Sequence, residues 1–184
     1  MRLFVSADVD ELAEEIAAIQ EPFAEASGLR LTDPEQAHIT LKFLGDTPER
    51  RLPAVTEAVE TAVEESEVAP FRAELGGLGV FPSLEYISVV WLGVREGGGQ
   101  LTRLHEHIEE RTTALGFDPE DHEFTPHVTL ARMDHAGGKE LVQELVEERD
   151  PTAGTLSMEA VSLTESTLTA DGPVYETVER FELA

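Results

Sequence analysis

Apolar and polar residues alternate along this chain in two rhythms, which predict a mixture of strands and helices. Runs in which every second residue is apolar are typical of half-buried strands, and apolar residues three or four apart are typical of amphipathic helices. Strands are predicted at residues 2–7, 30–31, 38–44, 71–80 and 86–94, then from His127 onwards, and at 155–166 and 175–183. Helices are predicted at residues 10–26, 48–65 and 100–115, with a short acidic one ending near Arg149.

Turn-forming residues separate these elements. Thr47 is expected to cap the second helix, with Pro48 in its first position. Residues 150–154 are expected to form a loop, and Asp171-Gly172 is expected to turn a terminal hairpin.

The order of these elements favours an α+β fold. Mainly antiparallel strands would form two similar lobes, with helices outside and a central cleft between the lobes. A chain of 184 residues can hold one large domain or two small lobes. We therefore expect residues 1–184 to form a single domain of two intertwined, pseudo-symmetric lobes.

One four-residue pattern occurs twice, as His38-Ile39-Thr40-Leu41 and as His127-Val128-Thr129-Leu130. Residues two apart on a strand share a face, so each histidine would point the same way as its threonine, with the apolar residues towards the core. The two pairs predict two half-sites facing a common cleft. Two imidazoles across a cleft suit acid–base chemistry on a phosphodiester, because one takes a proton while the other gives one.

Three residues near the repeats are candidates for contact with a substrate. Lys42 shares the parity of the first His/Thr pair if the strand is regular, which would bring its amine to the mouth of the cleft; a surface lysine is an equal alternative. Phe43 suits stacking on a base, although a core position is the simpler interpretation. Arg132 stands at the equivalent place after the second motif, where its planar fork suits a phosphate or an ordinary surface ion pair.

The other four histidines do not form a recognisable site. His105 and His107 lie two apart on a predicted helix, so they do not share a face, and a solvated surface is their expected environment. His122 lies in an acidic loop and His135 in a turn. No spacing of histidine, cysteine or carboxylate indicates a metal site.

The charge of the chain limits its environment and its partners. The sequence has 38 Asp+Glu against 13 Lys+Arg, a formal charge of −25, and the acids are spread along its whole length. Such a coat repels itself at low ionic strength, so we expect a salt-loving source and a melting temperature that rises with KCl. Broad nucleic-acid surfaces are basic, so any RNA contact of this chain is expected to be confined to a pocket.

Further limits come from what the sequence lacks. There are no cysteines, hence no disulfides, and no apolar run approaches the roughly 20 residues that span a bilayer. The first residues lack the longer apolar region of a signal peptide. We therefore expect a cytoplasmic protein that is a monomer by default.

The paired motifs and their surroundings resemble the two-histidine (2H) phosphoesterase superfamily, and in particular the RNA 2′,3′-cyclic phosphodiesterases of the LigT (ThpR) type, also called 2′-5′ RNA ligases. The similarity covers nearly the full length. The segments that carry it are RLFV at 2–5, HITLKFLG at 38–45, LGGLGVFPS at 75–83, VVWLGV at 89–94, PHVTLAR at 126–132, LTESTL at 163–168 and GPVY at 172–175. One H-x-T motif is weak evidence, whereas two within this order of segments are specific.

The resemblance implies hydrolysis of a terminal 2′,3′-cyclic phosphate to a 2′-phosphomonoester, and suggests ATP-independent 2′-5′ ligation as the reverse reaction. His38 is assigned as general acid and His127 as general base, with Thr40 and Thr129 donating hydrogen bonds to the non-bridging oxygens. Phe43 would pack against the terminal nucleoside. No metal or other cofactor is expected.

Three alternatives stay open from the residues themselves. The first is a non-catalytic RNA-end or nucleotide-binding module using the same cleft, which the intact His and Thr of both motifs argue against. The second is a metal-dependent hydrolase using His105, His107 or His122, whose mark would be inhibition by a chelator. The third is a structural acidic partner protein, for which the paired motifs would be a coincidence.

Overall fold

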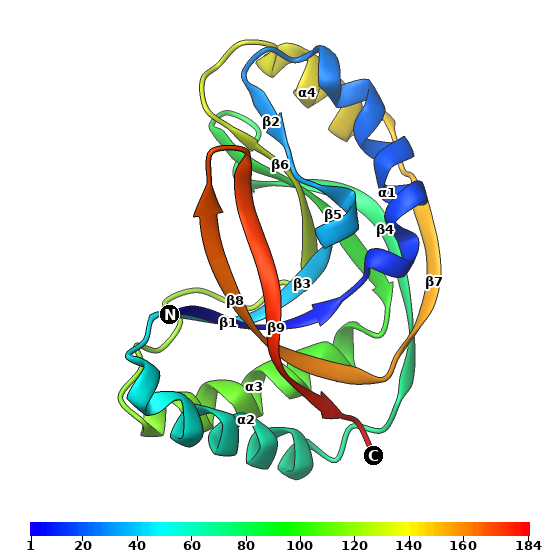
Figure 1. Ribbon diagram of the computed structural model, residues 1–184. Coiled ribbons are helices and arrows are strands. Elements are labelled where there is room, and N and C mark those ends of the chain that lie inside the picture. The colour runs from blue at the N-terminus through cyan, green and yellow to red at the C-terminus, as the bar shows by residue number, and fades with distance from the viewer.

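The computed structural model of residues 1–184 is built around one curled antiparallel sheet (Figure 1). Its strands are β1 (Arg2–Asp8), β2 (Leu29–Leu31), β3 (His38–Asp46), β4 (Phe71–Pro82), β5 (Ile87–Glu96), β6 (His127–Met133), β7 (Thr152–Met158), β8 (Ala160–Thr169) and β9 (Gly172–Glu182). Their order in the sheet is β7-β4-β5-β6-β3-β1-β8-β9, and β2 pairs with β6. The predicted α+β class with antiparallel strands is confirmed.

The sheet divides into two similar halves at the boundary between β6 and β3. The strands β7, β4, β5 and β6 form one half, and β3, β1, β8 and β9 form the other. Helices α2 (Leu52–Ser66) and α3 (Gly98–Ala114) pack together beneath the β3 half, whereas α1 (Ala13–Gln20) and α4 (Lys139–Glu148) lie along the other half (Figure 1). The two central strands are therefore those that carry the repeated motifs.

The apolar residues of both motifs anchor these central strands in the hydrophobic core. Ile39, Leu41, Val128 and Leu130 are all buried, and they belong to one core cluster of 30 residues that runs through both halves. Burial of a leucine or isoleucine side chain contributes about 1.5–3 kcal/mol. The polar partners in each motif are thereby held on the opposite face, as the alternation predicts.

The C-terminal third differs from its predicted arrangement. Residues 155–166 were expected to form one strand, but β7 and β8 are separate strands divided at Glu159. The former pairs with β4 and the latter with β1, so the chain crosses from one half of the sheet to the other at this residue. The loop expected at 150–154 is also wrong, because β7 already begins at Thr152. No glycine or proline marks the crossing, so local sequence carried no signal for it.

Two predicted helices begin differently from the expectation. Thr47 does not cap α2: its hydroxyl donates to the Gly45 carbonyl at 3.1 Å, and a 3₁₀ turn at Glu49–Arg51 leads into the helix. The helix predicted at 10–26 is α1 flanked by short 3₁₀ turns on both sides. None of the helices has the length and apolar character needed to cross a bilayer.

Candidate active site

The two H-x-T motifs lie side by side at the centre of the sheet. Ile39 of β3 pairs with Val128 of β6 in antiparallel register. The neighbouring positions on such a ladder bring His38 beside Thr129 and Thr40 beside His127. The fold thus joins the two predicted half-sites into one site.

Both imidazoles are oriented by the same kind of backbone contact. His38 Nδ1 lies 3.0 Å from the Gln36 carbonyl oxygen, and His127 Nδ1 lies 2.6 Å from that of Thr125. A carbonyl only accepts hydrogen bonds, so Nδ1 carries the proton in each ring. Each histidine therefore keeps its Nε2 for proton transfer. His38 Nε2 also lies 3.1 Å from the Thr40 hydroxyl, whereas His127 Nε2 has no partner within the protein.

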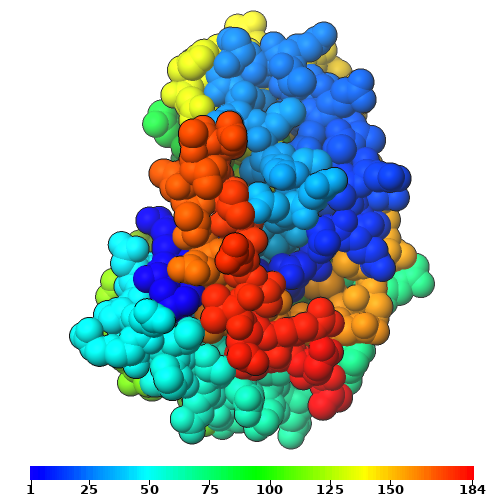
Figure 2. All heavy atoms as spheres, in the orientation of Figure 1, coloured from blue at the N-terminus to red at the C-terminus, as the bar shows by residue number.

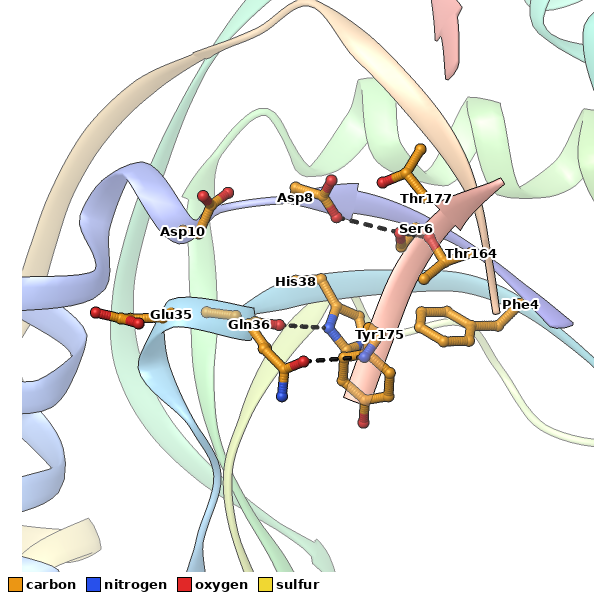
Figure 3. A pocket seen from close by; sticks show the side chains of 11 residues that line it. Phe4, Ser6, Asp8, Asp10, Glu35, Gln36, His38, Thr164, Tyr175 and Thr177 are labelled. Carbon is orange, nitrogen blue, oxygen red and sulfur yellow. Dashed lines mark hydrogen bonds between the residues drawn. The ribbon is translucent and has the colours of Figure 1, made fainter. Parts of the chain in front are cut away.

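Each imidazole packs against two aromatic rings, which also contact each other. The ring centroids of Phe4 and Tyr175 lie 5.0 Å and 5.1 Å from that of His38 (Figure 3). Those of Phe81 and Trp91 lie 5.0 Å and 5.9 Å from that of His127. These contacts restrict the orientation of each imidazole.

A β-bulge follows the first motif. On the ladder between β1 and β3, Ser6 pairs with Thr40 and Val5 pairs with Lys42. Leu41 is therefore an extra residue that has no pairing partner on β1. A bulge of this kind reverses which residues face each side of the sheet beyond it. Residues after Leu41 therefore no longer follow the parity of the His/Thr pair.

The second motif carries the same irregularity at the equivalent position. On the ladder between β5 and β6, Trp91 faces Thr129 and Val90 faces Ala131, which leaves Leu130 as the extra residue. The two halves of the site therefore share their backbone geometry as well as their sequence pattern.

The bulges decide which of the neighbouring candidates reach the cleft side. Phe43 is 63% exposed and lies on the side of Phe4, with ring centroids 6.2 Å apart. Arg132, at the equivalent place after the second motif, is exposed and has no carboxylate within ion-pair distance. The predicted core position of Phe43 is therefore wrong, and so is the alternative of a surface ion pair at Arg132.

Lys42 does not reach the cleft. Its side chain is only 1% exposed, and its Nζ donates to Glu109 Oε2 at 2.9 Å and to the Asp118 carbonyl oxygen at 2.6 Å. The expectation of a lysine at the cleft mouth assumed a regular strand, and the bulge at Leu41 turns the side chain to the opposite face. Lys42 ties β3 to α3 and to the loop that precedes β6.

His105 is buried, contrary to the expectation of a solvated surface. It is 8% exposed, its Nδ1 donates to the carbonyl oxygen of the bulged Leu41 at 2.7 Å, and its ring stacks on Phe124 at 4.2 Å between centroids. Phe124 leads directly into the second motif, so one side chain of α3 contacts the surroundings of both motifs. The signal was present in the sequence, since His105 follows the buried Leu101 by four residues and so lies on the apolar face of the helix.

The electrostatic surroundings of the two histidines differ. Burial lowers the pKa of both imidazoles, and the charge of Arg132 lowers both further. The carboxylate of Asp8 acts in the opposite direction on His38, whose pKa it raises. The charges of His38 and His122 lower the pKa of His127, and no carboxylate opposes them there. The charges that act on His38 thus include one that favours its protonated form, whereas those that act on His127 include none.

A cavity of about 150 Å³ borders His38 (Figure 3). Its lining includes the carboxylates of Asp8, Asp10 and Glu35, which repel anions. Arg132 supplies positive charge to both imidazoles from the side of β6. The arrangement favours an anion near Arg132 rather than in this cavity.

The geometry can be compared with known proteins. The family model described as "2'-5' RNA ligase superfamily" matches residues 8–168, which include both H-x-T motifs. The chain belongs to this superfamily. An RNA 2′,3′-cyclic phosphodiesterase of Methanocaldococcus jannaschii is 33% identical to this chain over 183 residues. The match covers 98% of this chain and 100% of the relative. An RNA 2′,3′-cyclic phosphodiesterase of Aeropyrum pernix is 38% identical over 151 residues, and the match covers 82% of this chain and 84% of the relative.

Solved structures of the superfamily show the same architecture. TT0787 of Thermus thermophilus superposes with a TM-score of 0.78 at 30% identity, covering 100% of this chain and 98% of the other. LigT of E. coli, in complex with 3′-AMP, superposes with a TM-score of 0.80 at 22% identity, covering 99% and 97%. The second likeness concerns the fold alone.

Several residues around the site of this superfamily member were not found from its sequence. Asp8, Gln36 and Tyr175 lie next to His38, although they belong to three different elements or loops. Tyr175 and Trp91 were noted only as parts of resembling segments, and the place of Trp91 beside His127 depends on the pairing of β5 with β6. None of the other histidines joins a group of side chains able to hold a metal ion.

Proposed function

We propose that this superfamily member is an RNA 2′,3′-cyclic phosphodiesterase, which hydrolyses a terminal cyclic phosphate to a 2′-phosphomonoester. The curated relatives named for that activity match nearly the full chain. The observation that carries the proposal is the matched pair of histidines, each fixed through Nδ1 by a carbonyl and each keeping Nε2 for proton transfer. The same site, run in reverse, would join RNA ends through a 2′-5′ linkage without ATP.

The roles of the two histidines follow from their surroundings. His127 Nε2 takes a proton from water, whose oxygen attacks phosphorus. The bond from phosphorus to the 3′ oxygen breaks, and His38 Nε2 gives its proton to that oxygen. His38 suits the acid because Asp8 favours its protonated form, and His127 suits the base because the charged groups that act on it are cations, which favour its neutral form. Each role is typically worth about 10²–10⁴ in rate.

The remaining site residues stabilise charge and hold the RNA end. Thr40 and Thr129 donate hydrogen bonds to the non-bridging oxygens as negative charge builds on phosphorus. Arg132 holds the neighbouring phosphate through its planar fork. Phe43 packs against the terminal nucleoside. RNA contact is local, as a surface with a net charge of −25 requires, and we place the enzyme in the cytoplasm as a monomer.

A short oligoribonucleotide ending in a 2′,3′-cyclic phosphate tests this function. It is incubated in high KCl with EDTA, with the wild type and the His127→Ala variant in parallel. A 2′-phosphate product from the wild type alone supports the proposal. Binding of the oligonucleotide without turnover by a well-folded wild type would identify an end-binding module instead. Turnover that EDTA abolishes and added metal restores would identify a metal-dependent hydrolase.

A further inference from the structure

The hairpin formed by β8 and β9 extends well beyond the rest of the sheet. β8 pairs with β1 only at residues 162–165, whereas β8 and β9 pair with each other as far as Thr169 and Gly172. Residues 166–175, here called the free arm, therefore project past the edge of β1. Figure 2 shows the hairpin as an orange and red ridge on this face of the molecule.

The free arm has an inner and an outer face of different chemistry. Tyr175 defines the inner face, because its ring packs edge-on against the imidazole of His38. The regular register beyond Thr164 places the following residues on the inner face of the hairpin: Thr164, Ser166, Leu168, Pro173, Tyr175 and Thr177. The outer face carries Glu165, Thr167, Val174 and Glu176. Both carboxylates thus point away from the site, and the inner face is uncharged in a chain that is otherwise strongly acidic.

An apolar row continues outward from the active site along this inner face. Leu168 lies opposite Pro173, one inner position beyond Tyr175. Its side chain is 83% exposed, more than any other large hydrophobic residue of the chain. Single exposed leucines are common on protein surfaces. Leu168, however, continues a row that begins at a catalytic imidazole.

Gln36 fixes the free arm relative to His38. Its side-chain amide donates to the Pro173 carbonyl at 3.0 Å. It also accepts from the Tyr175 backbone N–H at 2.9 Å (Figure 3), so it pairs with the arm as a neighbouring strand would. The backbone carbonyl of the same residue accepts from His38 Nδ1. One residue therefore holds the base of the arm and orients the imidazole, so their relative position is set.

We propose that the inner face of the free arm, at Leu168 and Pro173, binds the nucleotide on the 5′ side of the terminal nucleotide of a single-stranded RNA. The proposal rests on the phosphodiesterase function proposed above and names its substrate class: oligonucleotide ends rather than mononucleotides. An uncharged surface of apolar and hydroxyl side chains suits an unpaired base and its ribose. Because Glu165 and Glu176 lie on the outer face, the inner face itself places no carboxylate beside the phosphate that joins the two nucleotides.

Arg132 occupies the place on β6 that Phe43 occupies on β3, one residue past the position after the bulge, so it lies on the same side of the sheet as the His/Thr pairs. Its charge also lowers the pKa of the Tyr175 phenol, which burial raises. A phosphate held by Arg132 would thus lie beside the arm at Tyr175. The base that follows this phosphate on its 5′ side then meets Leu168.

A pair of neighbouring variants tests the proposal. Leu168→Glu places a carboxylate on the inner face, and Thr167→Glu adds the same charge one residue away on the outer face. Each is assayed on a nucleoside 2′,3′-cyclic monophosphate and on a trinucleotide ending in a 2′,3′-cyclic phosphate. We expect Leu168→Glu to lower the ratio of the trinucleotide kcat/KM to the mononucleotide kcat/KM about tenfold, which is the scale of one apolar side chain's contact. Thr167→Glu should leave that ratio unchanged.

Three outcomes overturn the proposal. The first is an equal ratio in both variants, and the second is a wild type that shows no preference for the trinucleotide. The third is a dimer of the wild type that Leu168→Glu dissociates without changing the ratio, which would make the arm an interface between two copies. Failure of the proposed function is distinct from all three, because a folded wild type would then turn over neither substrate.

Discussion

The His38 and His127 half-sites have nearly the same backbone and different electrostatic surroundings. Each has an imidazole bonded through Nδ1 to the carbonyl two residues earlier, two aromatic rings around it, and a bulge at the fourth motif residue. Asp8 raises the pKa of His38 alone, and the charged groups that act on His127 are all cationic. In the proposed mechanism, repetition of the fold supplies two equivalent proton-transfer groups, and their unequal charged surroundings make one the acid and the other the base.

The structural supports of the two half-sites also differ. The bulge in β3 is held by α3, through His105 on the Leu41 carbonyl and Glu109 on Lys42. After the bulge in β6, the residue equivalent to Lys42 is Ala131. Ala131 belongs to a second, smaller cluster of buried apolar residues. A buried ion pair on one side thus corresponds to plain apolar packing on the other.

The largest expected effects separate the two histidines. His38→Ala and His127→Ala should each lower kcat by about 10²–10⁴, since each removes one proton-transfer role. His127→Ala should lose the acidic limb of the kcat/KM profile and keep the alkaline one, and His38→Ala should do the reverse. Rates across pH on a cyclic-phosphate oligonucleotide measure this. Interchanged limbs would reverse the acid and base assignments, and one variant at wild-type activity would refute the two-histidine scheme.

Arg132 is the charge that both half-sites share, so its removal should affect them together. Arg132→Gln should lower kcat/KM by roughly 10- to 100-fold, the scale of a lost charge-assisted hydrogen bond. Because the guanidinium lowers the pKa of both imidazoles, both limbs should move to higher pH. Arg132→Lys is the matched control. It keeps the positive charge, so the two limbs of the pH profile should return towards their wild-type positions. The affinity for substrate should recover less, because it depends on the planar guanidinium. Limbs that stay fixed in Arg132→Gln would place Arg132 away from the site.

The support by α3 is tested with two substitutions of His105. His105→Asn can keep a donor for the Leu41 carbonyl, and His105→Phe can keep the ring stacked on Phe124. We expect His105→Phe to lower the free energy of unfolding by about 1–3 kcal/mol, because it leaves a buried carbonyl unpaired. It should also lower kcat more than it changes KM, since the loosened bulge adjoins Thr40, which stabilises the charge that builds on phosphorus. Equal kcat in both variants and the wild type would limit His105 to a structural role.

The smallest expected effect isolates the asymmetry itself. Asp8→Asn removes a carboxylate that raises the pKa of His38, so that pKa should fall. The alkaline limb of kcat/KM reports loss of the acid's proton and should move to lower pH, while the acidic limb of His127 stays in place. Asp10→Asn, at another carboxylate of the same cavity, is the control. A shift of the acidic limb instead would show that His38 is the base.

The two motifs could be predicted from the sequence, whereas the positions of the residues around them could not. The alternation of polar and apolar residues predicted that His38 shares a face with Thr40 and that His127 shares a face with Thr129. The burial of Ile39 confirms that the apolar residue between His38 and Thr40 faces the core. The same reasoning misplaced Lys42, because a bulge depends on how two strands pair and leaves no trace in the period of one of them. The position of Arg132 relative to both imidazoles likewise depends on contacts between strands distant in sequence.

By itself, the sequence determined the α+β class, the paired motifs and the family, since these depend on local periodicity and residue identity. Three features became known from the folded chain: β3 lies against β6, the chain crosses between halves at Glu159, and Asp8 and Tyr175 lie next to His38. The physical reason is that ladder hydrogen bonds and side-chain packing join segments far apart in the chain, and a local pattern of residues does not specify its partner.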